Sequence, residues 1–192
     1  MEAEYSVELG RDDAALEFPW SGDGKVFYYD LKCSPELLEE VPEASVYPEM
    51  RNLLRFVNSP ATPIESAKCD VWSSDEITPE EEIFGAKRKC ASYVDLLFSD
   101  GRRFRFADHE ELAKRLVALL GKAPEIPASA QVILRRCYYL IPGERDRSDN
   151  GFYITLYLSG FGDDEQQARQ RWGIGLNLAE NALRQLLARP LT

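Results

Sequence analysis

Alternation of apolar and polar side chains is the feature of this sequence that most restricts its fold. Between Phe152 and Leu158 the even positions are apolar, whereas the odd positions carry Tyr153, Thr155 and Tyr157. A period of two predicts a β-strand with one face in the core and the other face more polar. A solvated face of this kind is typical of an antiparallel sheet.

Other strands are predicted by the same alternation or by turn signals. They cover residues 4–9, 25–31, 66–72, 91–99, 102–106 and 130–141, with a short apolar piece at 14–20. Asp100-Gly101 indicates a tight hairpin that would join the strand at 91–99 to a return strand at 102–106. The polar segment 142–151 is expected to be a mobile loop.

Helices are predicted where a capping residue or a proline precedes an apolar stripe. Ser34-Pro35 begins a helical region that is expected to break at Pro42 and to resume near Pro48. A second helix lies between the capping residue Asp108 and Gly121. The longest helix follows Asp163 and carries the stripe Trp172, Leu176, Ala179, Leu183 and Leu186, while Gly173 and Gly175 indicate a kink or a close approach to the sheet.

The order of these elements predicts the fold class. From residue 25 onward it reads strand–helix–strand–strand, twice, followed by the C-terminal helix. Hairpins join the strands as often as helices do, which argues against a doubly wound parallel sheet. We therefore expect a single α+β domain over residues 1–192, with a mainly antiparallel sheet, helices on one face and a long C-terminal helix.

The charge of the chain restricts its partners. It has 33 acidic and 23 basic residues, a formal net charge of −10. Such a surface repels nucleic acid and anionic lipid, so we expect neither as a partner, whereas a basic protein or a cationic ligand fits. The first residues lack a signal-peptide pattern, and no stretch approaches the ~18 apolar residues of a membrane span, so a cytoplasmic location is expected.

Metal and catalytic signals are weak. The cysteines at 33, 69, 90 and 137 lie far apart, which fits neither a zinc site nor a disulfide framework, so we expect reduced thiols and no metal or cofactor. The one histidine, His109, falls in the first turn of a predicted helix. No catalytic residue can be assigned, and whether the protein is an enzyme stays open.

Acidic clusters lie at residues 36–43, 75–82 and 163–165. Helix caps and solvated helix faces account for each of them. The functional alternative is that two clusters merge into one negative patch that faces a basic partner.

The most informative feature is the polar-tipped face of the strands. If Arg135, Cys137 and Tyr139 point the same way as the tyrosines, one sheet face carries Tyr93, Asp95, Arg135, Tyr139, Tyr153, Thr155 and Tyr157. Tyrosine joins a flat apolar ring to a polar tip, which suits a ligand groove or a protein interface. The alternatives are an ordinary wet face, or a face covered by the N-terminal segment with Trp20.

Three functions follow, in order of preference. The first is a non-catalytic binding or interaction module that uses the aromatic sheet face or an acidic surface. Homodimerisation through the leucine stripe of the C-terminal helix is one version of it, although such a stripe more often packs on the protein's own sheet. The second is a small-molecule binding domain in which Asp95 balances a cationic ligand within a tyrosine-lined groove. The third is a hydrolase-type enzyme.

Overall fold

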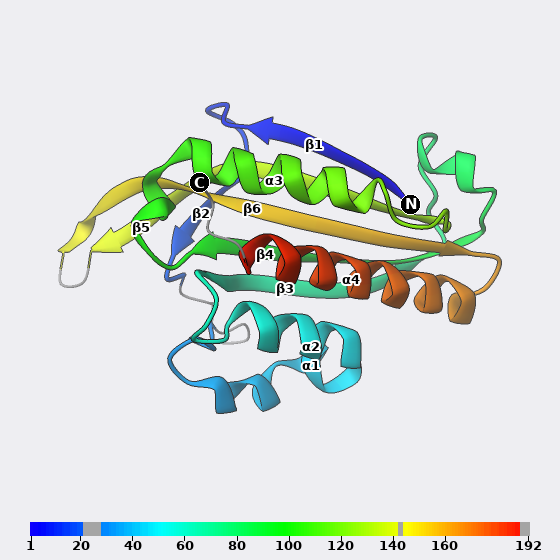
Figure 1. Cartoon of the computed structure of the whole chain (residues 1–192), viewed down its shortest axis with the longest axis horizontal. Coiled ribbons are helices and arrows are strands. Elements are labelled where there is room, and N and C mark those ends of the chain that lie inside the picture. The colour runs from blue at the N-terminus through cyan, green and yellow to red at the C-terminus, as the bar shows by residue number, and fades with distance from the viewer. Residues whose placement is uncertain (21–27, 142–143, 189–192) are drawn as a thin grey trace.

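The structure, a computed structural model, describes residues 1–20, 28–141 and 144–188. This part of the chain forms one sheet with helices packed on one of its faces (Figure 1). The strands are β1 (Glu2–Glu8), β2 (Ala15–Phe18), β3 (Ile64–Ser74), β4 (Arg88–Phe98), β5 (Ala128–Ile141) and β6 (Glu144–Gly162). The helices are α1 (Pro42–Val46), α2 (Pro48–Val57), α3 (Phe106–Leu120) and α4 (Glu165–Leu187), with short 3-10 helices η1 (Pro35–Glu40), η2 (Glu81–Phe84) and η3 (Gly101–Phe104).

The sheet is mostly antiparallel, as predicted. Its strand order is β1-β5-β6-β4-β3, and the neighbours β5, β6, β4 and β3 are antiparallel. Both β1 and β2 run parallel to β5, β1 along its first half and β2 along its second half. The two short strands thus follow one another along the same edge of the sheet, and β3 forms the opposite edge.

The main core lies between the sheet and the helices. α4 crosses this face beside α3 and α2 as one continuous helix (Figure 1). The predicted stripe from Trp172 to Leu186 is buried against the protein's own sheet. The Trp172 indole Nε1 donates a hydrogen bond of 2.8 Å to Ser92 Oγ on β4. The stripe is therefore used within the chain and is not available for a helical dimer.

Glycines permit the close contact between α4 and the sheet. A Cβ atom at Gly175 would lie 2.9 Å from Leu158 Cδ2 on β6. A Cβ atom at Gly160 on β6 would lie 2.6 Å from the Ala168 carbonyl oxygen and would overlap the backbone of Trp172. The helix glycines were expected to mark either a kink or a close approach to the sheet, and Gly175 marks a close approach. Gly173 instead faces α2, where a Cβ atom would meet the Glu49 side chain.

The predicted return strand at 102–106 is wrong. The Asp100 side chain accepts a hydrogen bond of 2.9 Å from the Arg102 backbone N–H and so caps η3. The chain then enters α3 at Phe106, two residues before the expected cap at Asp108. Part of the predicted repeat is present, because the order helix–strand–strand occurs twice, in α1/α2–β3–β4 and in α3–β5–β6. The strand predicted to precede α3 is absent from residues 101–104, which form η3 instead.

Other boundaries also differ from the prediction. Of the strand expected at 25–31, residues 25–27 lie outside the described residues and 28–31 are not a strand. A helix, α1, begins at Pro42 where a break was expected. Residues 144–151 belong to β6 and continue its pairing with β5 as far as Ile141, so most of the expected loop is a ribbon.

Candidate functional site

The strand register aligns side chains in rows across the sheet face that points away from the helices, called the open face here. One row, the tyrosine row, consists of Glu4, Gln131, Tyr157, Tyr93 and Asp70. The next row toward η2, the serine row, consists of Glu2, Ser129, Ser159, Ala91 and Trp72. Each row takes one side chain from each of five strands.

The structure brings all seven predicted site residues to this open face. Tyr93 pairs with Tyr157, Asp95 with Thr155, and Arg135 with Tyr153, while Tyr139 lies farther along β5. The register therefore fixes the orientation of β5 that the sequence left open. Because its neighbours Cys137 and Tyr139 pack with Tyr153, Arg135 belongs to the same face.

One end of the open face is covered by the N-terminal segment. Leu16 and Phe18 of β2 pack with Cys137, Tyr139 and Tyr153 in a second, smaller core. Tyr139 is 5% exposed and Tyr153 is 4% exposed. These two tyrosines support the fold at this end and are shielded from a partner.

The other end is covered by the segment around η2. The Phe84 ring stacks on Phe161 of β6, with centroids 4.3 Å apart and 9° between the ring planes. Beside them, Lys89 Nζ lies 2.9 Å from Glu81 Oε2. Within residues 1–20, 28–141 and 144–188, the chain thus covers both ends of its open face and leaves the middle uncovered.

The uncovered middle is the strip of sheet made by the serine row and the tyrosine row, and it is called the trough here. Its aromatic rings form a line, with centroids 6.5 Å apart for Trp72 and Tyr93 and 5.8 Å apart for Tyr93 and Tyr157. On the β1 side of Tyr157 this strip borders a hollow of about 540 Å³ beneath η2, whose walls include Glu2, Glu4 and Glu80. Volumes of this size are typical of ligand sites.

A chain of polar contacts runs beneath one side of the trough. Thr155 Oγ1 donates a hydrogen bond of 2.7 Å to Asp95 Oδ1, and Arg135 donates one of 3.1 Å to Thr155 Oγ1. Arg135 also forms an ion pair of 2.7 Å with Glu8 of the edge strand. Asp95 is only 6% exposed, and this burial raises the pKa of its carboxyl from 3.8 to about 6, against the opposing effects of Thr155, Lys68 and Arg135.

Cations of the protein already lie on open-face aromatic rings, among them Arg103 on Tyr139. Lys68 Nζ is 5.1 Å from the centre of the Trp20 ring, and the Arg135 guanidinium is 5.7 Å from the centre of Tyr157. Both charges also act on the Asp95 carboxyl. A small cation that used Asp95 as its counter-ion would compete with them, which weakens the predicted role of Asp95 in ligand binding.

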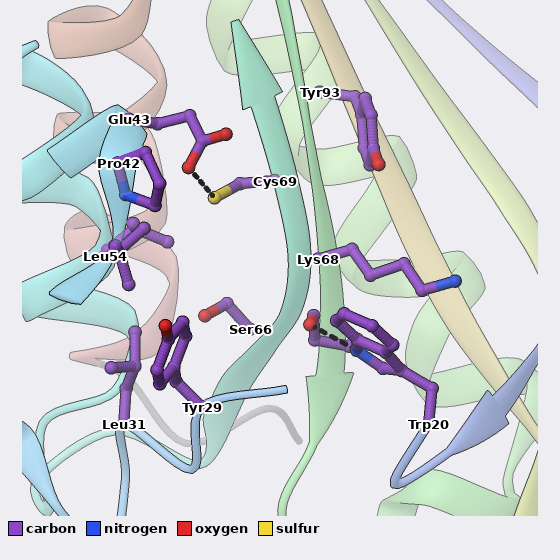
Figure 2. Close-up of a pocket in the computed structure, with 12 residues that line it drawn as sticks. Trp20, Tyr29, Leu31, Pro42, Glu43, Leu54, Ser66, Lys68, Cys69 and Tyr93 are labelled. Carbon is purple, nitrogen blue, oxygen red and sulfur yellow. Dashed lines mark hydrogen bonds between the residues drawn. The ribbon is translucent and has the colours of Figure 1, made fainter. Parts of the chain in front are cut away.

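A separate cleft of about 400 Å³ lies at the β3 edge. Figure 2 shows its residues from α1, α2 and the segment before η1 on one side of β3, and Lys68, Tyr93 and Trp20 on the other. Within it, Cys69 Sγ lies 3.9 Å from Glu43 Oε2. Burial raises the pKa of the Cys69 thiol well above its ordinary value, so the thiol stays protonated and is a poor nucleophile.

The histidine lies outside these hollows. His109, in the first turn of α3, is buried against Phe98 and Phe152, and its Nδ1 lies 2.9 Å from the Arg105 carbonyl oxygen. Burial lowers the pKa of its imidazole. His109 therefore lines neither the trough nor the β3 cleft.

Several trough residues were missed by sequence reasoning. Trp72 and Asp70 alternate with Cys69 and Val71 along β3, so the signal for their face was present in the sequence. Glu80 and the hollow depend on how the η2 segment folds over the sheet, for which the sequence gives no signal. The β3 cleft likewise exists only once α1 and α2 are placed beside the strand.

Among the described residues, no three His, Cys, Asp or Glu side chains are grouped so as to hold a metal ion. Within the same ranges, no helix is both long and apolar enough to span a membrane. The described cysteines at 33, 69, 90 and 137 are all free thiols. No protein-family model, curated protein or solved structure matches this chain.

Proposed function

We propose that this protein is a non-catalytic binding module that engages a protein partner through the trough. The observation that carries the proposal is the uneven cover of the open face. Its own chain buries Tyr139 and Tyr153 at one end and Phe161 at the other, yet Trp72, Tyr93 and Tyr157 stay partly exposed between them. Partly exposed, aligned aromatic rings are typical of protein interfaces, where tyrosine and tryptophan contribute much of the binding energy.

Photo-crosslinking tests this proposal directly. A photoreactive phenylalanine analogue at Tyr93 or Tyr157 is expected to crosslink one and the same identified protein in cells. The control position is Ile174, which is 42% exposed on α4, on the helix side of the sheet. A crosslink from position 174 alone, or none from 93 and 157, would contradict the proposal.

The crosslinked protein is then purified and its affinity measured. We expect the variant Tyr157→Ala to bind it at least about tenfold more weakly, because truncation of a central interface tyrosine typically costs about 2 kcal/mol or more, and about 1.4 kcal/mol is already a factor of ten. The variant Ile174→Ala should bind as the wild type does. Equal affinities for all three proteins would show that the trough is not the interface.

A small cationic ligand remains the second candidate, because the 540 Å³ hollow beside Tyr157 has acidic walls. This alternative would be favoured if free arginine bound the protein as tightly as an arginine-containing peptide does. The hydrolase-type alternative finds less support, because the histidine is packed between phenylalanines and the Cys69 thiol is held protonated.

A further inference from the structure

The carboxylates of the open face fall into two groups. Glu8 is paired with Arg135, and Glu81, which lines the hollow, is paired with Lys89. In the part of the chain that the structure describes, no cation lies within ion-pair distance of Glu2, Glu4 or Asp70. These carboxylates, which lack an ion-pair partner among the described residues, lie at the two ends of the rows. Glu4 also accepts a hydrogen bond of 2.6 Å from Gln131 Nε2.

The geometry of the tyrosine row sets a length. Glu4 and Asp70 end the row, and the five strands between and including theirs are about 4.8 Å apart, so the row spans about 19 Å. An extended peptide advances about 3.3 Å per residue. About six residues therefore bridge the two terminal carboxylates.

The centre of the row favours one kind of side chain. Tyr93 and Tyr157 present two adjacent rings with centroids 5.8 Å apart. Arg135 already engages Tyr157, whereas no cation of the described residues lies on the Tyr93 ring, so Tyr93 is the free ring for an incoming cation. A guanidinium stacks on aromatic rings better than an ammonium does, because it is planar and more weakly hydrated. The apolar wall at Ile83 of η2, which is 73% exposed, can pack against the aliphatic part of such a side chain.

We propose that the trough binds an extended, arginine-containing basic segment of a protein partner, laid across the strands for about six residues. An arginine of this segment stacks on the Tyr93–Tyr157 pair, and the flanking basic side chains pair with Glu4 at one end and Asp70 at the other. This inference rests on the proposed function and adds the chemistry of the partner. The partner is a protein segment, because the chain's overall charge of −10 repels polyanions and attracts polycations.

Calorimetric titration with three peptides tests the inference. Hexaarginine is expected to bind at least about threefold more tightly than hexalysine, because only the guanidinium stacks well on tyrosine. Hexaglutamate should show no binding. Raising the salt concentration should weaken the binding of hexaarginine, because the flanking pairs lie at the surface.

Matched charge variants separate the trough from the overall charge. The double variant Glu2→Gln/Glu4→Gln should weaken hexaarginine binding roughly fivefold, since each surface pair contributes up to ~1 kcal/mol. The control Glu36→Gln/Glu40→Gln removes the same charge from η1 and should stay within about twofold of wild type. Tyr157→Leu should weaken binding roughly threefold through loss of the stacked ring. Circular dichroism and thermal melting verify that each variant is folded.

Equal affinities for hexaarginine and hexalysine, or equal losses in the two double variants, would overturn the inference, because either result means attraction by net charge alone. The failure of hexaarginine to bind would overturn it as well. If the crosslinks from positions 93 and 157 still identify a partner, only the basic chemistry is wrong and the binding function stands. If those crosslinks are also absent, the proposed function fails too.

Discussion

Asp95 is a buried carboxyl beside an open surface. It is almost fully enclosed and accepts a hydrogen bond from the neutral hydroxyl of Thr155, while Lys68 and Arg135 act on it as charges. Removal of a carboxylate from water disfavours its ionised form unless close partners compensate. The raised pKa shows that compensation here is incomplete. Asp95 should therefore lower the stability of the folded protein once it ionises.

The variant Asp95→Asn tests this expectation. The folded carboxyl has a pKa of about 6, whereas its ordinary value is 3.8, so the folded state loses stability relative to the unfolded state as the pH rises through this window. Asparagine stays neutral and can still accept the hydrogen bond from Thr155. At about pH 8 we expect Asp95→Asn to be more stable than wild type by on the order of 2–3 kcal/mol, and at about pH 4 the difference should largely vanish.

Urea unfolding followed by tryptophan fluorescence at both pH values measures the effect. Asp70→Asn, which removes the same charge from an exposed position of the same face, is the control and should change stability by less than about 0.5 kcal/mol. If Asp95→Asn destabilised the protein equally at both pH values, the carboxyl would be well compensated by its neighbours, contrary to this account.

Among the glycines that lie close to another element, Gly160 of β6 makes the closest contact, which is with α4. Gly160 faces the backbone of Ala168 and Trp172, which cannot move aside as a flexible side chain could. The contact also positions Trp172, whose indole is hydrogen-bonded to Ser92 of β4. The long helix and the central strands are thus packed backbone against backbone at this point.

The variant Gly160→Ala is expected to lose at least about 2 kcal/mol of unfolding free energy, because overpacking forces the helix away from the sheet. Gly101→Ala is the matched control, since a Cβ there meets nothing within 4 Å. The control should remain within about 0.5 kcal/mol of wild type, by chemical denaturation. Equal stabilities for the two variants would show that the helix can shift freely at Gly160.

Sequence periodicity identifies most elements because each strand has one apolar face. It succeeds for β4 and β6, and it places Tyr93, Asp95, Tyr153, Thr155 and Tyr157 on one face. It fails at 102–106 because Phe104 and Phe106 are spaced as on one face of a strand. Phe104 instead lies in η3 and packs on Tyr139, and Phe106 begins α3 and packs on Phe152. It fails at 144–151 because polar residues there are held by ladder hydrogen bonds with β5, which leave no apolar pattern.

The site was predictable only in part, for a related reason. Alternation indicates which residues share a face of one strand, but the register that aligns Glu4, Tyr157 and Asp70 joins strands far apart in the sequence. The burial of Tyr139 and Tyr153 depends on β2 running parallel to β5, a pairing without a local signal. Trp72 was visible by its alternation, yet its contact with Tyr93 follows from the pairing of β3 with β4.

For the whole molecule, the arrangement of the layers predicts its state of association. The leucine stripe of α4 is buried on the protein's own sheet, which removes the helical route to a dimer. We expect light scattering after size exclusion to give one chain mass, 21.8 kDa, at two protein concentrations. A mass near twice that value, unchanged on dilution and reduced by Tyr157→Ala, would identify a second copy as the occupant of the trough.

The strands that form the trough also form the main core, with alternate residues serving each. In β6, for example, Leu156 and Leu158 hold the helices while Tyr157 faces outward between them. The outward positions can therefore be exchanged one at a time without repacking the helices. A protein built this way could acquire new partners by single substitutions, and its binding preference could diverge between lineages faster than its fold does.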